Sequence, residues 1–136
     1  MTTQQQTQTP TGADEVADAY VAAFRGGDLA RAGELMAPDM VRVSPLEGTG
    51  DAGEIRGLDA IMANAARLTA EYDIRGVDVQ GPFVSGDRFA VRFAFDQVHV
   101  PTGHRADTVK MCLYTVVGGR IAREEVFYHN EPQQAG

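Results

Sequence analysis

Hydrophobic residues recur at helical spacing in three stretches of the first half of the chain. Between Asp14 and Phe24, apolar side chains would share one face of a helix, which ends at Gly26-Gly27. Asp28 would cap a second helix that stops at Pro38. Apolar residues of this second helix form one stripe: Leu29, Ala32, Leu35 and Met36. The third predicted helix carries a similar stripe: Leu58, Ile61, Met62, Ala65 and Leu68.

Beyond residue 71 the hydrophobic period changes to two, which is typical of strands. Tyr72 and Ile74 have one parity whereas Val77 and Val79 have the other, so a bulge at Gly76 would bend this strand. Later strands are predicted over 89–96, 108–117 and 121–129. Their turns lie at 85–87, 101–103 and 118–119, and a short early strand over 40–43 ends at Pro45.

The remaining segments lack periodicity. Residues 1–12 contain almost nothing apolar and predict a disordered tail, with a second tail over 132–136. Residues 46–56 are rich in glycine and acids and predict a mobile loop. Residues 13–131 would then form one domain, long enough to bury a single core.

This order of elements predicts an α+β fold. Three helices come first, and a run of hairpin-linked strands follows. We expect the strands to form a strongly bent, mainly antiparallel sheet that wraps over the helices, because each element has one apolar face to bury.

The composition restricts the partners. The 136 residues include 12 basic and 19 acidic side chains, giving a net charge of -7 and no basic cluster. This charge disfavours nucleic acid and anionic membranes. The single cysteine, Cys112, cannot form an intrachain disulfide, and neither a leader pattern nor a long apolar run is present, so a cytoplasmic protein is expected. No dinucleotide or phosphate-binding motif appears, so no cofactor is predicted.

Several short motifs resemble the nuclear transport factor 2-like, or SnoaL-like, superfamily between about Asp14 and Asn130. They are Tyr-Val-Ala-Ala-Phe at 20–24 with Gly-Asp-Leu at 27–29, Ala37-Pro38-Asp39, Val43-Ser44-Pro45, residues 55–61, Pro101-Thr102-Gly103, and Gly-Gly-Arg-Ile at 118–121. The superfamily includes ketosteroid isomerases and SnoaL-type polyketide cyclases. The resemblance implies a cone-shaped α+β barrel in which the helices and the concave side of a bent sheet enclose an apolar cavity.

Similarity to ketosteroid isomerase permits a comparison of catalytic positions. Tyr20 matches the tyrosine that binds the oxyanion in that family. The general-base aspartate falls on Ser44, which cannot shuttle a proton between carbons near neutral pH. The protonated aspartic acid falls on Cys112, a weak donor, and the same position holds the acid/base aspartate of SnoaL-type cyclases. One of three groups is present, which argues against ketosteroid isomerisation but not against another site in the same cavity.

The strand period suggests which side chains would line that cavity. If Cys112 points inward, Lys110, Tyr114 and Val116 do as well. The comparison places Glu124 and Tyr128 inward on the last strand. A buried Glu124 would have a raised pKa and could act as acid or base opposite Tyr20. Alternatively, Glu124 is a surface carboxylate paired with an arginine. Glu47, in the 46–56 loop, could replace the missing base or remain a solvated loop acid.

The other candidates have structural interpretations beside the functional ones. His99 and His104 would come together at one end of the sheet, where a proton relay is conceivable. Cys112 on an apolar strand is expected to be an inert packing residue with a raised pKa. The histidines and Asp107 lack metal-site spacing, so no metal is expected. The predicted ligand-binding set is Tyr20, Ser44, Met62, Phe93, His99, Cys112, Tyr114 and Tyr128.

Two functions follow from this reading. Loss of both aspartates favours a protein that binds a small apolar molecule. We expect this protein to form a homodimer through its apolar strand face at residues 109, 111, 113, 115 and 117. The alternative is a cofactor-free isomerase, cyclase or dehydratase. Such an enzyme would abstract a proton next to a carbonyl, with Tyr20 holding the enolate and Glu124 or Glu47 as the base.

Overall fold

The computed structural model describes residues 12–45 and 53–128. Three helices, α1 (Ala13–Arg25), α2 (Leu29–Glu34) and α3 (Leu58–Glu71), accompany one six-stranded sheet. Its strands are β1 (Met36–Val43), β2 (Glu54–Arg56), β3 (Tyr72–Ser85), β4 (Arg88–His99), β5 (His104–Val117) and β6 (Arg120–Tyr128). The predicted α+β class, with three helices before the long hairpins, is confirmed. Both expected tails lie outside the described residues, apart from Gly12, which is the N-cap of α1.

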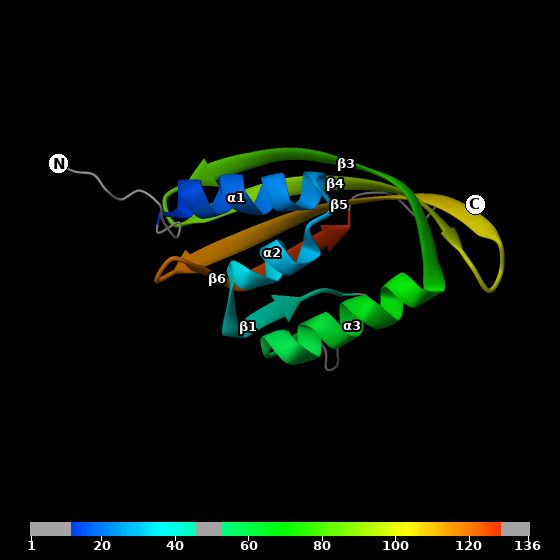
Figure 1. Cartoon of the computed structure of the whole chain (residues 1–136), viewed down its shortest axis with the longest axis horizontal. Coiled ribbons are helices and arrows are strands. Elements are labelled where there is room, and N and C mark those ends of the chain that lie inside the picture. The colour runs from blue at the N-terminus through cyan, green and yellow to red at the C-terminus, as the bar shows by residue number, and fades with distance from the viewer. Residues whose placement is uncertain (1–11, 46–52, 129–136) are drawn as a thin grey trace.

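The sheet is mixed and has the order β2-β1-β6-β5-β4-β3. Only the β1–β6 pairing is parallel among the described strands, and the others are antiparallel. Helix α3 contacts β1 and β2 at one edge of the sheet and β3 at the opposite edge. The sheet does not close into a barrel, because its edge strands β2 and β3 are not paired with each other. Helix α3 lies below the sheet and contacts both edges (Figure 1).

The long strands bend where the sequence predicts. The β3–β4 register shifts between Ile74 and Gly76, so the predicted bulge at Gly76 is confirmed. In Figure 1, β3 rises from the end of α3, and β3 and β4 then arch over the helices. The backbone N–H of Val100 donates to the carbonyl of Glu71 at 2.8 Å, which ties the β4–β5 turn to that same helix end.

Two predictions in the first half of the chain are wrong. The second helix ends at Glu34, and Met36 begins β1 instead of completing a helical stripe. The strand accommodates Pro38 because the β1–β6 register shifts between Met36 and Val41. At such an irregularity, the backbone N–H that proline lacks is not needed for a regular inter-strand hydrogen bond. Glu54–Arg56 is a strand paired with Val41–Val43, although the sequence predicted a loop there. Residues 46–52 of that predicted loop lie outside the described part of the chain.

The core lies between α1 and the concave face of the sheet. Val16, Ala17 and Tyr20 on α1 are almost completely buried, as are Phe89 and Val91 on β4. The amphipathic pattern of α1 explains this arrangement, because its apolar positions meet the inward-facing positions of β3, β4 and β5. The helix thereby fixes Tyr20 above the centre of the sheet.

Candidate functional site

A cavity of about 600 Å³ lies between the concave face of the sheet and the three helices. One end is deep, because Tyr20, Tyr114 and Glu124 line it with at most 4% of their surface exposed. The other end is a mouth lined by apolar side chains that remain partly exposed, namely Leu29, Met62, Ile74 and Val77. The middle of the cavity is lined by Phe93, Phe95, Leu68 and Lys110.

Two tyrosines share a hydrogen bond at the deep end. The hydroxyl of Tyr20 on α1 lies 2.9 Å from the hydroxyl of Tyr114 on β5, and their ring centroids are 4.8 Å apart. Tyr20 therefore lines the cavity and also makes an internal hydrogen bond. Burial raises the pKa of each phenol, and the nearby Glu124 raises that of Tyr20 further. Both hydroxyls therefore stay protonated and can act as hydrogen-bond donors.

An ion pair lies beside the tyrosines. Arg42 Nη1 donates to Glu124 Oε1 at 2.6 Å, and the two side chains are only 13% and 5% exposed. Strand register creates this cluster, since Arg42 is opposite Glu124 across β1 and β6, and Glu124 is opposite Tyr114 across β6 and β5. Thus the cavity contains a carboxylate already neutralised by a guanidinium.

Glu124 combines features of both sequence interpretations. It lines the cavity, as the functional interpretation requires, and it is paired with an arginine, as the structural interpretation proposed. Arg42 was not predicted as a site residue, because its role depends on the parallel β1–β6 pairing and no local sequence pattern indicates that pairing. Its parity with buried Met40 was the available signal.

The other predicted site residues divide into two groups. Met62, Phe93 and Tyr128 line the cavity together with Tyr20, Tyr114 and Glu124. Ser44 and Cys112 are buried but are not among its lining residues. Burial raises the pKa of the Cys112 thiol to about 12, in agreement with the predicted inert packing role. Glu47 lies outside the described residues.

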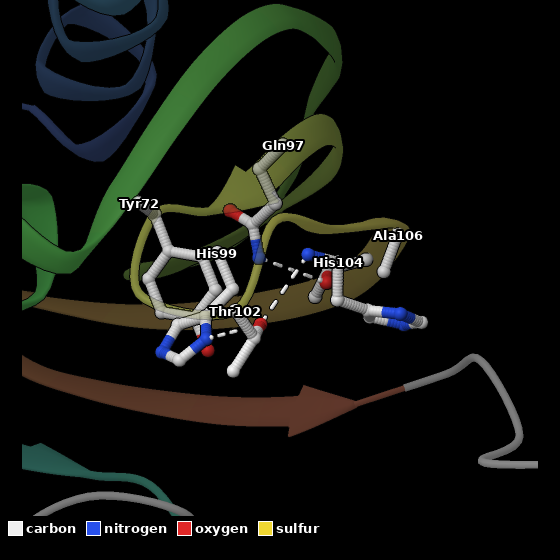
Figure 2. A pocket seen from close by; sticks show the side chains of 7 residues that line it. Tyr72, Gln97, His99, Thr102, His104 and Ala106 are labelled. Carbon is white, nitrogen blue, oxygen red and sulfur yellow. Dashed lines mark hydrogen bonds between the residues drawn. The ribbon is translucent and has the colours of Figure 1, made fainter.

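The two histidines lie at the turn between β4 and β5, where they border a second pocket (Figure 2). This pocket adjoins the cavity, since Tyr72, Gln97 and Thr108 line both. His99 and His104 are register partners, so their predicted proximity is confirmed. His99 Nδ1 lies 2.8 Å from Thr102 Oγ1, and its ring packs against Tyr72 with centroids 5.0 Å apart. In Figure 2 the His104 ring points away from His99, so the two rings are not aligned for proton transfer between them.

No group of three or more His, Cys, Asp or Glu side chains that could hold a metal ion occurs in residues 12–45 and 53–128. Over those same two segments, no helix has the length and apolar character needed to cross a membrane.

Comparison with known proteins identifies the family. The model of the SnoaL-like domain matches residues 17–124, so this chain belongs to the SnoaL-like family. No curated protein matched the sequence. The resemblance inferred from the sequence motifs is thereby confirmed.

Solved structures agree with this assignment. A candidate SnoaL-like polyketide cyclase from Mesorhizobium loti, also described as a carbohydrate phosphatase, is 32% identical. The match covers 85% of this chain and 97% of that one, with a TM-score of 0.76. An NTF2-like protein from Burkholderia thailandensis is 21% identical over 87% of this chain and 91% of that one, with a TM-score of 0.72. TerC, co-crystallised with polyporic acid, is 23% identical over 86% and 91% of the two chains, with a TM-score of 0.66. The last two similarities support the cone fold alone.

Proposed function

We propose that this protein binds a small, largely apolar compound in the cone cavity. The observation that carries the proposal is the cavity itself, whose 600 Å³ volume lies within the usual range for small-molecule sites. Its walls are mostly aliphatic and aromatic, while its few polar groups gather at defined places. This combination favours a ligand with an apolar body and one or two oxygen atoms.

The deep end is suited to a carbonyl or hydroxyl oxygen. Tyr20 and Tyr114 keep their protons, so one hydroxyl can donate to the other and the remaining hydrogen can be offered to a ligand. The Arg42–Glu124 pair is fixed by strand register and needs no rearrangement to receive a ligand. The fold of TerC, which was co-crystallised with polyporic acid, supports the idea that such a cone can admit an organic compound.

Fluorescence titration with N-phenylnaphthylamine, an uncharged aromatic probe, tests the proposal. Ala65 lines the cavity on α3, whereas the adjacent Ala66 does not, and both positions are exposed. Ala65→Trp should obstruct the cavity and abolish saturable binding, while Ala66→Trp should leave the dissociation constant unchanged. Equal binding by both variants, or no binding by the parent protein, would overturn the proposal.

Catalysis is the second candidate function, favoured because Tyr20 and Glu124 line the same cavity. An enzyme of this type would abstract a proton next to a carbonyl with Glu124 while a tyrosine hydroxyl stabilises the enolate. On any substrate found, Tyr20→Phe and Glu124→Gln should each lower kcat with the circular dichroism spectrum unchanged. Full activity in both variants would exclude this mechanism.

We further propose that two copies pair through the outer face of the sheet, in the cytoplasm. Phe127 on β6 is 54% exposed and is the register partner of Met111 on β5, so an apolar strip faces outward. Neither a cofactor nor a nucleic-acid or membrane partner enters this proposal, in keeping with the net charge of -7. Sedimentation should show a dimer at micromolar concentration and a monomer for Phe127→Glu. A monomeric parent protein would contradict the pairing.

A further inference from the structure

Lys110 is the only lysine among the 12 basic residues of the chain, and it lines the cavity. It lies on β5, where its register partners are Phe93 on β4 and Tyr128 on β6. Its ammonium group lies 5.3 Å from the ring centroid of Phe95 and 6.0 Å from that of Phe93. The cation is therefore held over two aromatic rings in the middle of the cavity wall.

No carboxylate neutralises this cation in the structure of residues 12–45 and 53–128. The other charged residues lining the cavity there are Arg42 and Glu124, which are paired with each other at 2.6 Å. Aromatic faces attract an ammonium group but do not accept hydrogen bonds from its donors as an anionic oxygen would. Lys110 thus differs from Arg42, whose partner belongs to the protein.

The surroundings define what could complete the site. A negatively charged oxygen beside Lys110 would find a concentrated positive charge, and an attached aromatic ring would find Phe93 and Phe95. In a protein of net charge -7, an anionic ligand needs such a local cation to offset the overall repulsion. We propose that Lys110 binds the acidic group of an aromatic acid whose ring system occupies the cavity. This inference rests on the proposed binding function and specifies the ligand class.

A pair of probes separates the charge from the ring system. Anilinonaphthalene sulfonate and N-phenylnaphthylamine have the same ring skeleton, but only the first carries an anionic group. Lys110→Met should weaken binding of the sulfonate about tenfold or more, the usual effect of losing one charged contact. The same substitution should leave binding of the uncharged probe nearly unchanged, which also shows that the variant is folded.

Two controls complete the experiment. Lys110→Arg keeps the positive charge and should retain most of the sulfonate affinity. Arg120→Met removes the same charge from the exposed start of β6, outside the cavity, and should have no effect on either probe. Suppose that Lys110→Met and Arg120→Met bind the sulfonate equally well while Ala65→Trp still excludes both probes. This result would overturn the role of Lys110 but leave the proposed binding function standing. Failure of both probes to bind the parent protein would overturn both proposals.

Discussion

Two polar clusters on this sheet use similar contacts in opposite surroundings. At the deep end of the cavity, Arg42 and Glu124 are paired with side chains 13% and 5% exposed. At the β4–β5 turn, Arg105 and Asp96 are paired just as closely, at 2.6 Å, but are 64% and 34% exposed. The first pair is removed from water and the second is not, so equal distances do not imply equal contributions to stability.

The comparison also separates structure from recognition. Each cluster contains an internal polar contact beside its ion pair, the Tyr20–Tyr114 bond in the cavity and the His99–Thr102 contact at the turn. Lys110 lies between them along β5, with aromatic rings in place of an anion. A charge neutralised within the fold maintains geometry, whereas a charge without an anionic partner can recognise a ligand.

The largest expected effect comes from breaking the buried ion pair. Arg42→Met would leave the Glu124 carboxylate buried without its cation and should lower the free energy of unfolding by about 3 kcal/mol. Urea denaturation measures this change. The double variant Arg42→Met, Glu124→Leu should lose much less than the sum of the two single variants, because neither charge remains unpaired. Additive losses would show that the two side chains are not coupled.

Alkaline pH should destabilise the protein through the buried thiol. The pKa of Cys112 rises from 9.0 to about 12 on folding, so its contribution is complete below pH 9 and is lost as the pH rises toward 12. The free energy of unfolding should fall by about 2 kcal/mol between pH 9 and 10.5 from this thiol alone. Tyr20 and Tyr114, whose pKa values are also raised, add to the loss above pH 10.0.

Cys112→Ala provides the matched control for this titration. The variant is expected to be less stable near pH 8 because it leaves a small cavity, but its stability should stay flat between pH 8 and 9.5. A decline as steep as that of the parent protein would assign the alkaline transition to other groups.

Removing one hydroxyl of the tyrosine pair should have a smaller effect. Tyr20→Phe deletes the 2.9 Å bond and leaves the Tyr114 hydroxyl without this partner, which should cost about 1–2 kcal/mol in unfolding free energy. Tyr72→Phe is a suitable control, because that half-buried ring contacts His99 through its face and would retain the contact. Thermal or urea unfolding that ranks the two variants equally would argue against a distinct role for the pair.

Breaking the exposed Arg105–Asp96 pair should change the titration of Asp96 and not the stability of the protein. The hydrogen bond from Arg105 lowers the pKa of Asp96, so the Asp96 carboxyl should titrate below its usual value of 3.8 in an NMR experiment. Arg105→Met should return the pKa toward 3.8, and high salt should have a similar though weaker influence. An unchanged Asp96 titration in Arg105→Met would contradict the assigned cause.

Much of the fold could be predicted because it follows from the local periodicity of apolar residues. The apolar face of α1 and the bulge at Gly76 each depend on spacing within one segment. The extent of β1 could not be predicted in this way. Pro38 ordinarily ends regular structure, and only the parallel partner β6 explains why a strand continues through it.

The candidate site was predictable to a similar degree. Tyr20 followed from the helical face, and strand parity placed Tyr114 on the same side as Cys112. The inward direction of Glu124 and Tyr128 came from the resemblance to ketosteroid isomerase. Arg42 was missed, because its role needs the β1–β6 register. Strand parity placed Lys110 on the same side as Tyr114, but its lack of an acidic partner among the described residues is visible only in three dimensions. Both are properties of contacts between segments distant in sequence.

A crystal structure of the protein with N-phenylnaphthylamine tests the central claim most directly. The proposed binding function predicts density for the probe between α3 and the concave face, with its rings against Phe93 and Phe95 and one edge toward Tyr20 and Tyr114. A cavity filled by the protein's own side chains, with the probe on the outer face of the sheet, would contradict the claim.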